Sequence, residues 1–245
     1  MVELDLVIPV YNEGSNIHRV LNALAEGVST SFRVLICYDF EEDDTLVALR
    51  DYESEKVNLE LVKNPGRGPH AAVLAGFSAS EAPGVLVYPA DDDYNAGRLD
   101  AMVDQLRAGC DVVCASRFIP GGDMVGCPWL KSVLVRSAAF TLFHLARLPT
   151  RDATNGFRMF SRRVLNEIEI ESCEGFTYSL ELLVKAHRLG WRVGEVPVQW
   201  FERGSGQGKS RFKVLNWLIP YLRWYVYAFA TTLLRRGPDT VSRRH

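Results

Sequence analysis

The first half of the chain alternates short apolar segments with segments in which apolar residues recur every three or four positions. Strands are predicted over residues 4–10, 32–38, 58–63, 85–88 and 111–115, and the apolar run that begins at Val85 is expected to be buried. Between them the clearest helical face runs from Ile17 to Leu24, after Ser15 as a candidate N-cap. This alternation is typical of an α/β fold with a mostly parallel sheet flanked by helices. In such sheets, ligands bind beyond the carboxyl ends of the strands.

The second half is less regular. We expect a long helix over 129–146, a loop over 150–158, a helix over 178–189 and a strand over 191–201. The sequence shows neither an internal repeat nor a low-complexity linker. We therefore expect a single catalytic domain over residues 1–213, followed by an aromatic-rich helical segment and a basic tail over residues 214–245.

Composition excludes some classes of protein. The chain has 245 residues, of which 47% are hydrophobic and 24% charged, with a net charge of -2, as in ordinary soluble globular proteins. A dedicated nucleic-acid binder would be basic, so no nucleic-acid partner is expected. The five cysteines include no C-x-x-C pair, and the N-terminus shows no signal-peptide pattern. Reduced thiols in a cytoplasmic protein are the simplest interpretation.

The most informative polar cluster is Asp91-Asp92-Asp93, which follows the predicted strand over 85–88 and precedes a turn. Three adjacent carboxylates repel one another. A divalent cation that carries a diphosphate gives such a cluster a purpose, because Mg²⁺ is typically held by one or two carboxylates together with substrate phosphates. A solvated acidic turn is the alternative.

Polar and turn-forming residues also follow the other predicted strands. They are Pro9 to Glu13, Asp39 with Asp43 to Thr45, and Asn64 to Gly68. Parallel strands bring their carboxyl ends to the same edge of a sheet, so these segments are expected to lie beside Asp91 to Asp93.

In this order the segments resemble the inverting glycosyltransferases of family 2. V-I-P-V-Y-N-E at residues 7–13 matches the start of that family, N-x-G-x-G falls at 64–68, and D-x-D falls at Asp91 and Asp93. The usual D-D-G-S turn is altered at Tyr38 to Thr45. The resemblance implies the nucleotide-diphospho-sugar transferase (GT-A, Rossmann-like) fold and a Mg²⁺ or Mn²⁺ cofactor.

Later motifs are similar to those of the dolichyl- and polyprenyl-phosphate mannose or glucose synthases. These motifs are S-R-F at 116–118 with Gly121-Gly122, D-A-T-N-G-F-R at 152–158, G-E-V-P-V at 194–198, and Arg203 with G-K-S-R-F at 208–212. The resemblance implies transfer of a hexose from a GDP- or UDP-sugar to a polyprenyl phosphate.

The same resemblance implies roles for particular residues. The nucleotide-sugar residues are Pro9, Tyr11, Glu13, Asp39, Asp91, Asp92, Arg203 and Arg211. The metal residues are Asp93 and Asn95. The acceptor-phosphate residues are Arg117, Arg136, Ser137 and Ser210. Catalysis would depend most on Asp91, Asp93, Arg117 and Arg203.

The chemistry of the acceptor separates two hypotheses. A phosphate monoester has a second pKa of about 6, so it is mostly dianionic near pH 7 and needs cations to place it rather than a strong base. A saccharide or lipid hydroxyl would need a carboxylate base, for which Asp152 and Glu181 are the candidates. The altered segment at Tyr38 to Thr45 motivates a third hypothesis, a nucleotide-sugar-binding protein without turnover.

The stretch from Val214 to Leu234 is rich in Trp and Tyr and is long enough to span a bilayer. Arg223, Pro220 and Asn216 argue against a span. We expect interfacial helices that lie on a membrane, with the basic tail near anionic lipid. A helix packed on the core is the alternative. The expected location is therefore the cytoplasmic face of a membrane, with a homo-oligomer left open.

Overall fold

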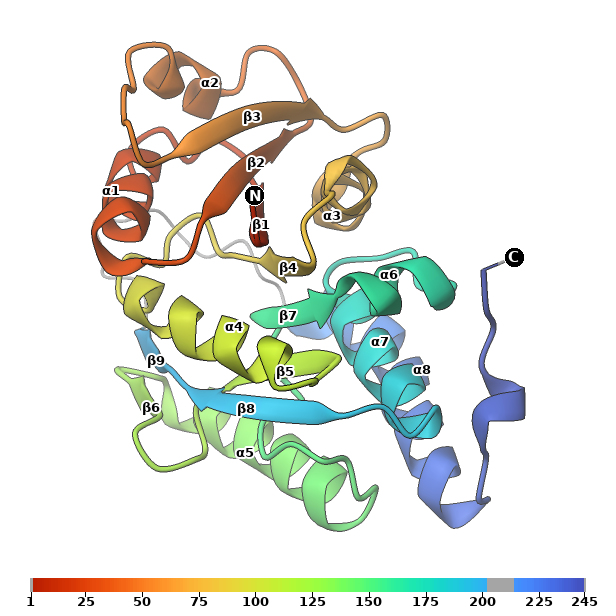
Figure 1. The fold of residues 1–245 in the computed structure, drawn as a ribbon. Helices are drawn as coiled ribbons and strands as arrows, with labels where there is room; N and C mark the ends of the chain where they lie inside the picture. Colours follow the sequence, from red (N-terminus) through yellow and green to blue (C-terminus); the bar gives the residue numbers. More distant parts are fainter. Residues whose placement is uncertain (1, 202–213, 245) are drawn as a thin grey trace.

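Helices cover both faces of a central sheet (Figure 1). The computed structural model describes residues 2–201 and 214–244. The strands are β1 (Leu4–Pro9), β2 (Phe32–Tyr38), β3 (Asn58–Lys63), β4 (Gly84–Val87), β5 (Val112–Ser116), β6 (Asp123–Val125), β7 (Arg158–Ser161), β8 (Val193–Pro197) and β9 (Gln199–Phe201). The α-helices are α1 (Ile17–Gly27), α2 (Asp44–Leu49), α3 (Gly68–Ala79), α4 (Leu99–Arg107), α5 (Trp129–His144), α6 (Arg162–Glu167), α7 (Thr177–Arg188) and α8 (Val214–Leu233). Short 3₁₀ turns occur at Ala96–Arg98 and Pro238–Thr240.

The main sheet is mostly parallel, as the sequence predicts. Within the described residues its strand order is β3-β2-β1-β4-β7-β5-β8. The exception is β7, which pairs antiparallel with both β4 and β5. A second sheet pairs β6 with β9. The fold is therefore an α/β sheet that is interrupted by one reversed strand.

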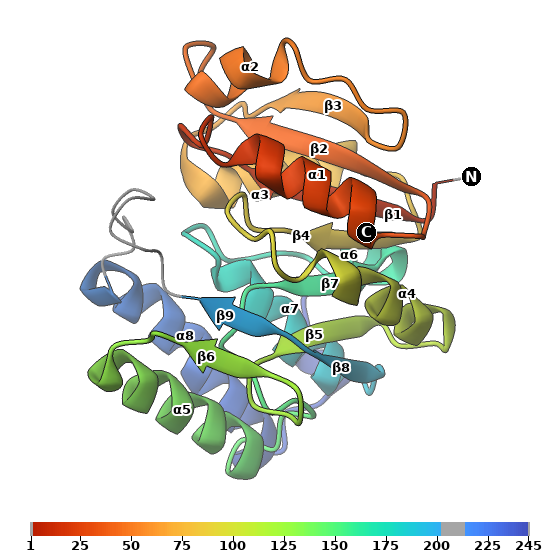
Figure 2. The same cartoon turned by 90° about the vertical axis from the view of Figure 1, so that its left-hand side faces the viewer.

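Two apolar cores lie on opposite faces of the sheet. One core joins α1 and α4 to the strands, and α1 contributes Ile17, Val20, Leu21 and Leu24, all of them fully buried as their spacing predicts. The other core contains residues from α3, α6 and α7 and, farther out, from α5 and α8. Figure 2 shows α1 and α4 on one side of the strands and α5 beside α8 below them.

The last long helix packs against the body of the protein through one face only. Trp224 and Ala228 of α8 are buried in the core that contains α7. The guanidinium of Arg188 on α7 donates to Thr231 Oγ1 at 2.6 Å and to the carbonyl of Tyr227 at 2.7 Å. Within the described residues, none of the helices has the length and apolar content that crossing a bilayer requires. One face of α8 is therefore packed on the core, as in the alternative considered above, and the expected contact of this helix with a membrane stays a prediction.

Three local expectations are wrong. The N-cap position of α1 is Asn16, not Ser15, and its side chain makes no capping bond. The predicted strand over 191–201 is two strands, because β5 ends at Ser116 and residues beyond Val198 pair with β6 instead. The predicted loop over 150–158 ends in β7, whose first residue is Arg158.

Candidate active site

The site lies at the edge of the sheet where β1, β2, β4 and β5 end. Because β7 runs in the opposite direction, its amino end reaches this same edge: Arg158 pairs with Val87 near the end of β4 and with Cys114 near the end of β5. The loop over 152–157, which precedes β7, therefore lies between the segments that follow β4 and β5. This reversal brings together residues that are far apart in the sequence.

The carboxylate of Asp92 organises the turn after β4. Its oxygens accept hydrogen bonds from the backbone amides of Tyr94 at 3.0 Å and Asn95 at 2.9 Å, and from the Asn95 side chain at 2.7 Å. Burial raises the pKa of the Asp92 carboxyl above its ordinary value, and the hydrogen bonds from Asn95 and Tyr94 oppose that shift. The neighbouring phenol of Tyr88 also has a raised pKa, because it is buried and lies near the three carboxylates.

Asp93 has the character of a metal ligand. Its Oδ1 is buried and has no hydrogen-bond partner among the described residues, and its Oδ2 lies 3.6 Å from the Arg19 guanidinium. In the described part of the chain, no three His, Cys, Asp or Glu side chains gather closely enough to hold a metal by themselves. A buried carboxylate oxygen without a partner fits a cation whose other ligands come from substrate phosphates and water. The surroundings of Asp93 fit such a cation, and its role as a metal ligand stays a prediction.

The side chain of Asn95 joins the acidic turn to the second sheet. Its Nδ2 donates to Asp92 and, at 2.8 Å, to the carbonyl of Gln199, while its Oδ1 accepts from the amide of Gln199 at 3.0 Å. Asn95 is buried and would have to exchange the Oδ1 contact to bind a metal. Its metal-binding role stays a prediction, beside the structural role that these contacts give it.

On the donor side, Asp39 is tied to the glycine-containing loop. Its Oδ1 accepts from Asn64 Nδ2 at 2.6 Å, and its Oδ2 accepts from the amide of Gly68 at 2.8 Å. Gly68 has a φ of +84°, a conformation in which glycine is favoured. Asp39 therefore fixes the shape of the loop that begins α3.

The segment that follows β1 is held by the altered region, through two residues to which the sequence analysis gave no role. Asp43 is fully buried; it caps α2 by accepting from the amide of Thr45 at 2.9 Å, and it accepts from the amide of Asn12 at 3.1 Å. Thr45 Oγ1 accepts from the amide of Glu13 at 2.9 Å. Asp is a preferred N-cap residue, which was the available signal for the capping role of Asp43, whereas the contact between Thr45 and Glu13 had no local signal.

Three other residues predicted to bind the nucleotide sugar lie on this segment or at the end of β1. Pro9 ends β1, and the exposed ring of Tyr11 lies edge-on to Phe40 with 5.4 Å between their centroids. The carboxylate of Glu13 accepts from Asn16 Nδ2 at 2.7 Å. Although the D-G-S sequence is altered, the chain still places these residues beside Asp39 on neighbouring strand ends.

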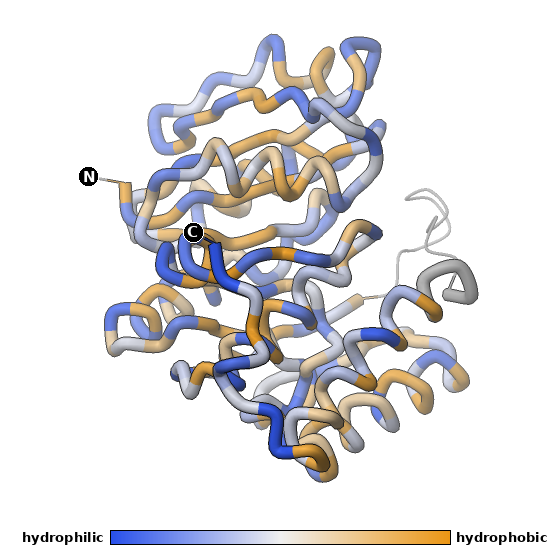
Figure 3. The backbone as a smooth tube through the Cα atoms, turned by 90° about the vertical axis from the view of Figure 1, so that its right-hand side faces the viewer, coloured by the Kyte–Doolittle hydropathy of each residue, from blue (hydrophilic) through white to orange (hydrophobic). Residues whose placement is uncertain are grey.

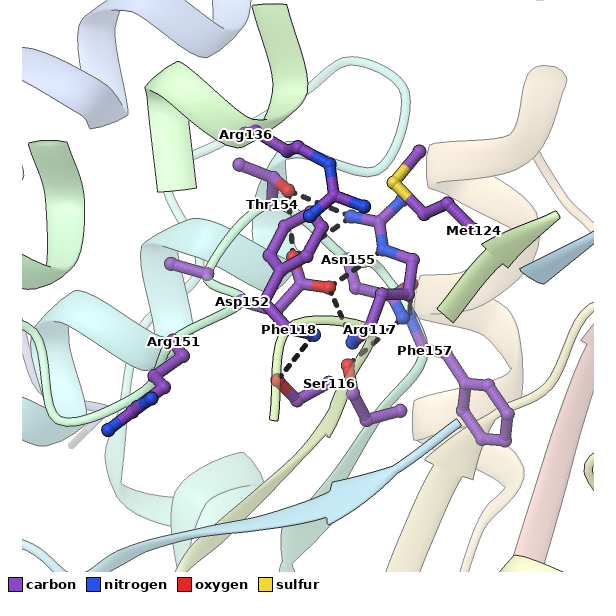
Figure 4. A network of polar contacts seen from close by, with 12 residues as sticks. Ser116, Arg117, Phe118, Met124, Arg136, Arg151, Asp152, Thr154, Asn155 and Phe157 are labelled. Atoms are coloured by element: carbon purple, nitrogen blue, oxygen red, sulfur yellow. Dashed lines mark hydrogen bonds and ion pairs between the residues drawn. The ribbon is translucent and has the colours of Figure 1, made fainter. Parts of the chain in front are cut away.

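On the acceptor side, Arg117 is held by a buried carboxylate (Figure 4). Asp152, which is fully buried, accepts from Arg117 Nε at 2.7 Å, from its Nη2 at 2.9 Å and from its backbone amide at 3.0 Å. Thr154 Oγ1 accepts from the same Nη2 at 2.9 Å. This forked pairing fixes the plane of the guanidinium.

A second guanidinium faces the same aromatic ring. The ring centroid of Phe118 lies 5.3 Å from Arg117 Cζ and 5.0 Å from Arg136 Cζ. Arg136 lies on α5 and is exposed, as is Ser137, the next residue of that helix. Two cations over one ring, one fixed and one solvent-exposed, form a favourable site for an anion such as a phosphate.

Both carboxylates considered as a catalytic base are engaged elsewhere. Burial by itself would raise the pKa of Asp152, but the charge of Arg117 and the hydrogen bonds to Arg117 and Thr154 outweigh burial and lower it. Glu181 is fully buried, and it accepts from Lys185 Nζ at 2.7 Å and from the amides of Glu171 and Ser172. Asp152 has a lowered pKa, and both carboxylates are fully buried, so neither has the open access that a general base needs.

Arg203, Ser210 and Arg211, predicted for the diphosphate and the acceptor, lie outside the described residues. Arg19 was not among the predicted site residues, because nothing in the polar face of α1 distinguishes it from a solvated arginine.

The sequence matches the family model for glycosyl transferase family 2 over residues 5–169. The polyprenol monophosphomannose synthase of Mycolicibacterium smegmatis is 29% identical over 232 residues, which cover 87% of this chain and 86% of the relative. An uncharacterized glycosyltransferase of Mycobacterium bovis is 31% identical over 220 residues, covering 90% and 95%.

Solved structures with the same fold include glucosyl-3-phosphoglycerate synthase from Mycobacterium tuberculosis. Its complex with UDP superposes with a TM-score of 0.66 at 16% identity, covering 93% of this chain and 80% of that chain. Its complex with Mn²⁺, UDP and glucosyl-3-phosphoglycerate gives a TM-score of 0.63 at 17% identity, covering 99% and 86%. These similarities show a GT-A fold. Because the family model matches more than half of the 245 residues, the protein is a glycosyltransferase that belongs to glycosyl transferase family 2.

Proposed function

We propose that the protein transfers a hexose, with inversion and with a divalent metal, from a nucleoside-diphosphate sugar to a polyprenyl phosphate at the cytoplasmic face of a membrane. The choice of acceptor is supported by similarity to a polyprenol monophosphomannose synthase, 29% identical over most of both chains. A nucleotide-sugar donor is supported by relatives of the same fold with UDP bound, although their identity of 16–17% leaves GDP and UDP equally open here.

The observation that carries the proposal is the pair of guanidinium groups at Phe118. A phosphate acceptor already holds its negative charge, so it needs cations to place its oxygen and no carboxylate to remove a proton. Arg117 and Arg136 supply the cations, with their Cζ atoms 5.3 Å and 5.0 Å from the centroid of the same ring. The nearest carboxylate, that of Asp152, is bound to Arg117 with a lowered pKa and is poorly suited to act as a base.

On the donor side, Asp39, Tyr11 and Glu13 would surround the nucleotide, and Asp91 and Asp93 would lie at its diphosphate. A divalent cation held by Asp93, with or without Asn95, would act as a Lewis acid toward the departing diphosphate. Arg203 and Arg211 would add positive charge to the same diphosphate, and Ser210 would contact the acceptor phosphate.

The transfer does not require a group that removes or carries a proton. A phosphate oxygen of the acceptor attacks the anomeric carbon from the face opposite the diphosphate. The bond from that carbon to the diphosphate oxygen breaks, and the nucleoside diphosphate leaves with the electron pair. Arg117 and Arg136 would orient the attacking oxygen, and positioning of this kind can by itself accelerate a reaction greatly.

The test compares two acceptors that differ only in the phosphate. The purified protein is incubated with Mn²⁺, radiolabelled GDP- or UDP-hexoses, and either a polyprenyl phosphate or the corresponding polyprenol. We expect an organic-soluble, acid-labile product with the phosphate alone. Product from the free alcohol would favour the hydroxyl acceptor, and donor binding without product from any pair would favour a non-catalytic protein.

A further inference from the structure

The helices α5 and α8 each present a stripe of large apolar side chains to solvent. The exposed members of the stripes are Trp129, Leu130, Val133, Leu134 and Phe140 on α5, and Ile219, Leu222, Val226 and Leu233 on α8. Trp129 and Ile219 retain 76% and 78% of their surface. At 3.6 residues per turn, these positions place each set along one side of its helix.

The opposite sides of both helices are packed. Ala139 and Leu142 of α5 and Trp224 and Ala228 of α8 are buried in the core beneath. The helices also contact each other, because Thr141 Oγ1 and the Tyr225 hydroxyl share a hydrogen bond of 2.5 Å. Figure 3 shows apolar residues along both neighbouring helices as well as along the central strands. The two stripes therefore belong to adjacent parts of one surface.

The charges on these helices have one sign. Neither the sequence of α5 nor that of α8 contains Asp or Glu, whereas α5 carries Lys131 and Arg136 and α8 carries Arg223. Arg235 and Arg236, both exposed, follow α8 directly. Glu171, whose Oε1 lies 3.9 Å from Arg223 Nη2, is an acidic neighbour contributed by another segment. Apolar stripes on helices whose own charged residues are all basic, with tryptophan at one end, are typical of helices that lie on an anionic bilayer.

The surface also adjoins the proposed acceptor site. Arg136 lies on α5 between Val133 and Phe140 and is one of the two cations at Phe118. An acceptor that joins a phosphate to a long apolar chain could place its phosphate at Arg136 while its chain stayed in a bilayer that contacts the stripe. The site and the surface are thus suited to opposite ends of one kind of molecule.

From these observations we propose that the α5/α8 surface, defined by the nine apolar side chains named above, binds an anionic lipid bilayer. The apolar side chains of the stripes insert between the lipid chains, and the basic residues of these helices contact the headgroups. This inference deepens the proposed function by naming the surface that faces the lipid, and it rests on that function only for the orientation of the acceptor.

The test is co-sedimentation of the full chain with vesicles of phosphatidylcholine that contain 30% or no phosphatidylserine. Trp129→Ser with Val133→Ser removes apolar side chains from α5, and Leu222→Ser with Val226→Ser removes them from α8. Each pair is expected to weaken binding to the anionic vesicles at least tenfold. Val47→Ser with Leu61→Ser, at positions 53% and 49% exposed outside these helices, is the matched control and should bind like the unaltered protein.

Fold integrity is checked in each variant by its thermal shift with nucleotide, and turnover is measured with a short-chain, water-soluble prenyl phosphate. Turnover should persist in both helix variants. If the unaltered protein fails to bind anionic vesicles, or binds them as well after the substitutions, the surface proposal is wrong. If it sediments instead as a dimer that the substitutions dissociate, the surface contacts a second copy. Vesicle binding without turnover would refute the proposed function and leave the surface assignment intact.

Discussion

Replacing Asp152 by asparagine separates an ion-pair partner from a catalytic base. The substitution preserves shape but removes the charge that faces Arg117. Asp152 accepts from three nitrogen atoms of Arg117 and from Thr154, and an amide presents one acceptor oxygen where the carboxylate has two. One end of the amide would therefore face donors, and the almost fully buried guanidinium would lose its counter-ion.

The expected loss of stability follows from the burial of Arg117. Removing one partner of a buried ion pair costs about 3–5 kcal/mol, because the remaining charge stays out of water. For a protein of this size, each kcal/mol lowers the melting temperature by about 2–4 °C, so the variant should melt about 6–20 °C lower. Since Asp152 also fixes the plane of Arg117, we expect the acceptor KM to rise by about tenfold, with turnover falling by less than a hundredfold.

The assay combines calorimetry with steady-state kinetics on a polyprenyl phosphate. Asp5→Asn is the matched control: Asp5 is also fully buried, and it accepts from Arg33 Nε at 2.9 Å and Nη2 at 3.0 Å, near the start of β1 and away from the site. It should lower the melting temperature similarly and leave the acceptor KM unchanged. The reasoning is refuted if Asp152→Asn keeps full stability while turnover falls more than a hundredfold, which is the behaviour of a base.

Three further predictions concern the metal, the second sheet and pH. Asp93→Ala should abolish activity, because the Oδ1 that has no hydrogen-bond partner among the described residues is lost. Calorimetry in the presence of nucleotide should show Mn²⁺ binding weakened at least tenfold. Undiminished Mn²⁺ binding would exclude Asp93 as a ligand. Asn95→Ala should lower the free energy of unfolding by about 2 kcal/mol in urea titrations, because buried groups of Asp92 and Gln199 lose partners; an unchanged value would mean that the second sheet is held independently. Burial lowers the pKa of His70 and His187, so near their ordinary pKa of 6.5 the unfolded chain binds more protons than the folded chain. The free energy of unfolding should therefore fall as pH drops from 7 to 5. The double variant His70→Asn, His187→Asn should make this dependence on pH weaker, and an equally steep dependence would assign it to other groups.

Local patterns in the sequence were sufficient to predict the helices and strands of the first half of the chain. The buried face of α1 and the buried strands β1, β2 and β4 follow from spacing and apolar content alone, because burial selects those residues wherever the rest of the chain lies. The reversed strand β7 was missed for a physical reason. It is four residues long and begins with Arg158, a fully buried side chain that donates to backbone carbonyls of Ala153 and Asn155 and to Ser179. The partners of this charged side chain lie in the loop before the strand and on α7, so the sequence of the strand itself gives no signal that Arg158 is buried.

The candidate site was predictable only in part, for the same reason. Motifs identified Asp93 and Arg117 as chemically distinctive, but the environment that fixes the behaviour of each side chain comes from distant segments. The pairing of Arg117 with Asp152 joins residues 35 positions apart, and the contact between Asn95 and Gln199 joins residues 104 positions apart. The sequence analysis therefore offered Asp152 as a base, whereas its surroundings give it a lowered pKa and a positioning role.

The reversed strand also explains how the two halves of the site meet. Had β7 run parallel to β4 and β5, the loop over 152–157 would open at the opposite edge of the sheet, and Arg117 would lack its carboxylate. Instead, β7 lies between β4, which ends at the acidic turn, and β5, which ends at Arg117. A partnerless carboxylate oxygen and a fixed cation are thereby placed on either side of one strand. Under the proposed function, such an arrangement would hold the departing diphosphate and the incoming phosphate apart until both are aligned with the sugar, and this separation of like charges is what direct transfer between two phosphates would require.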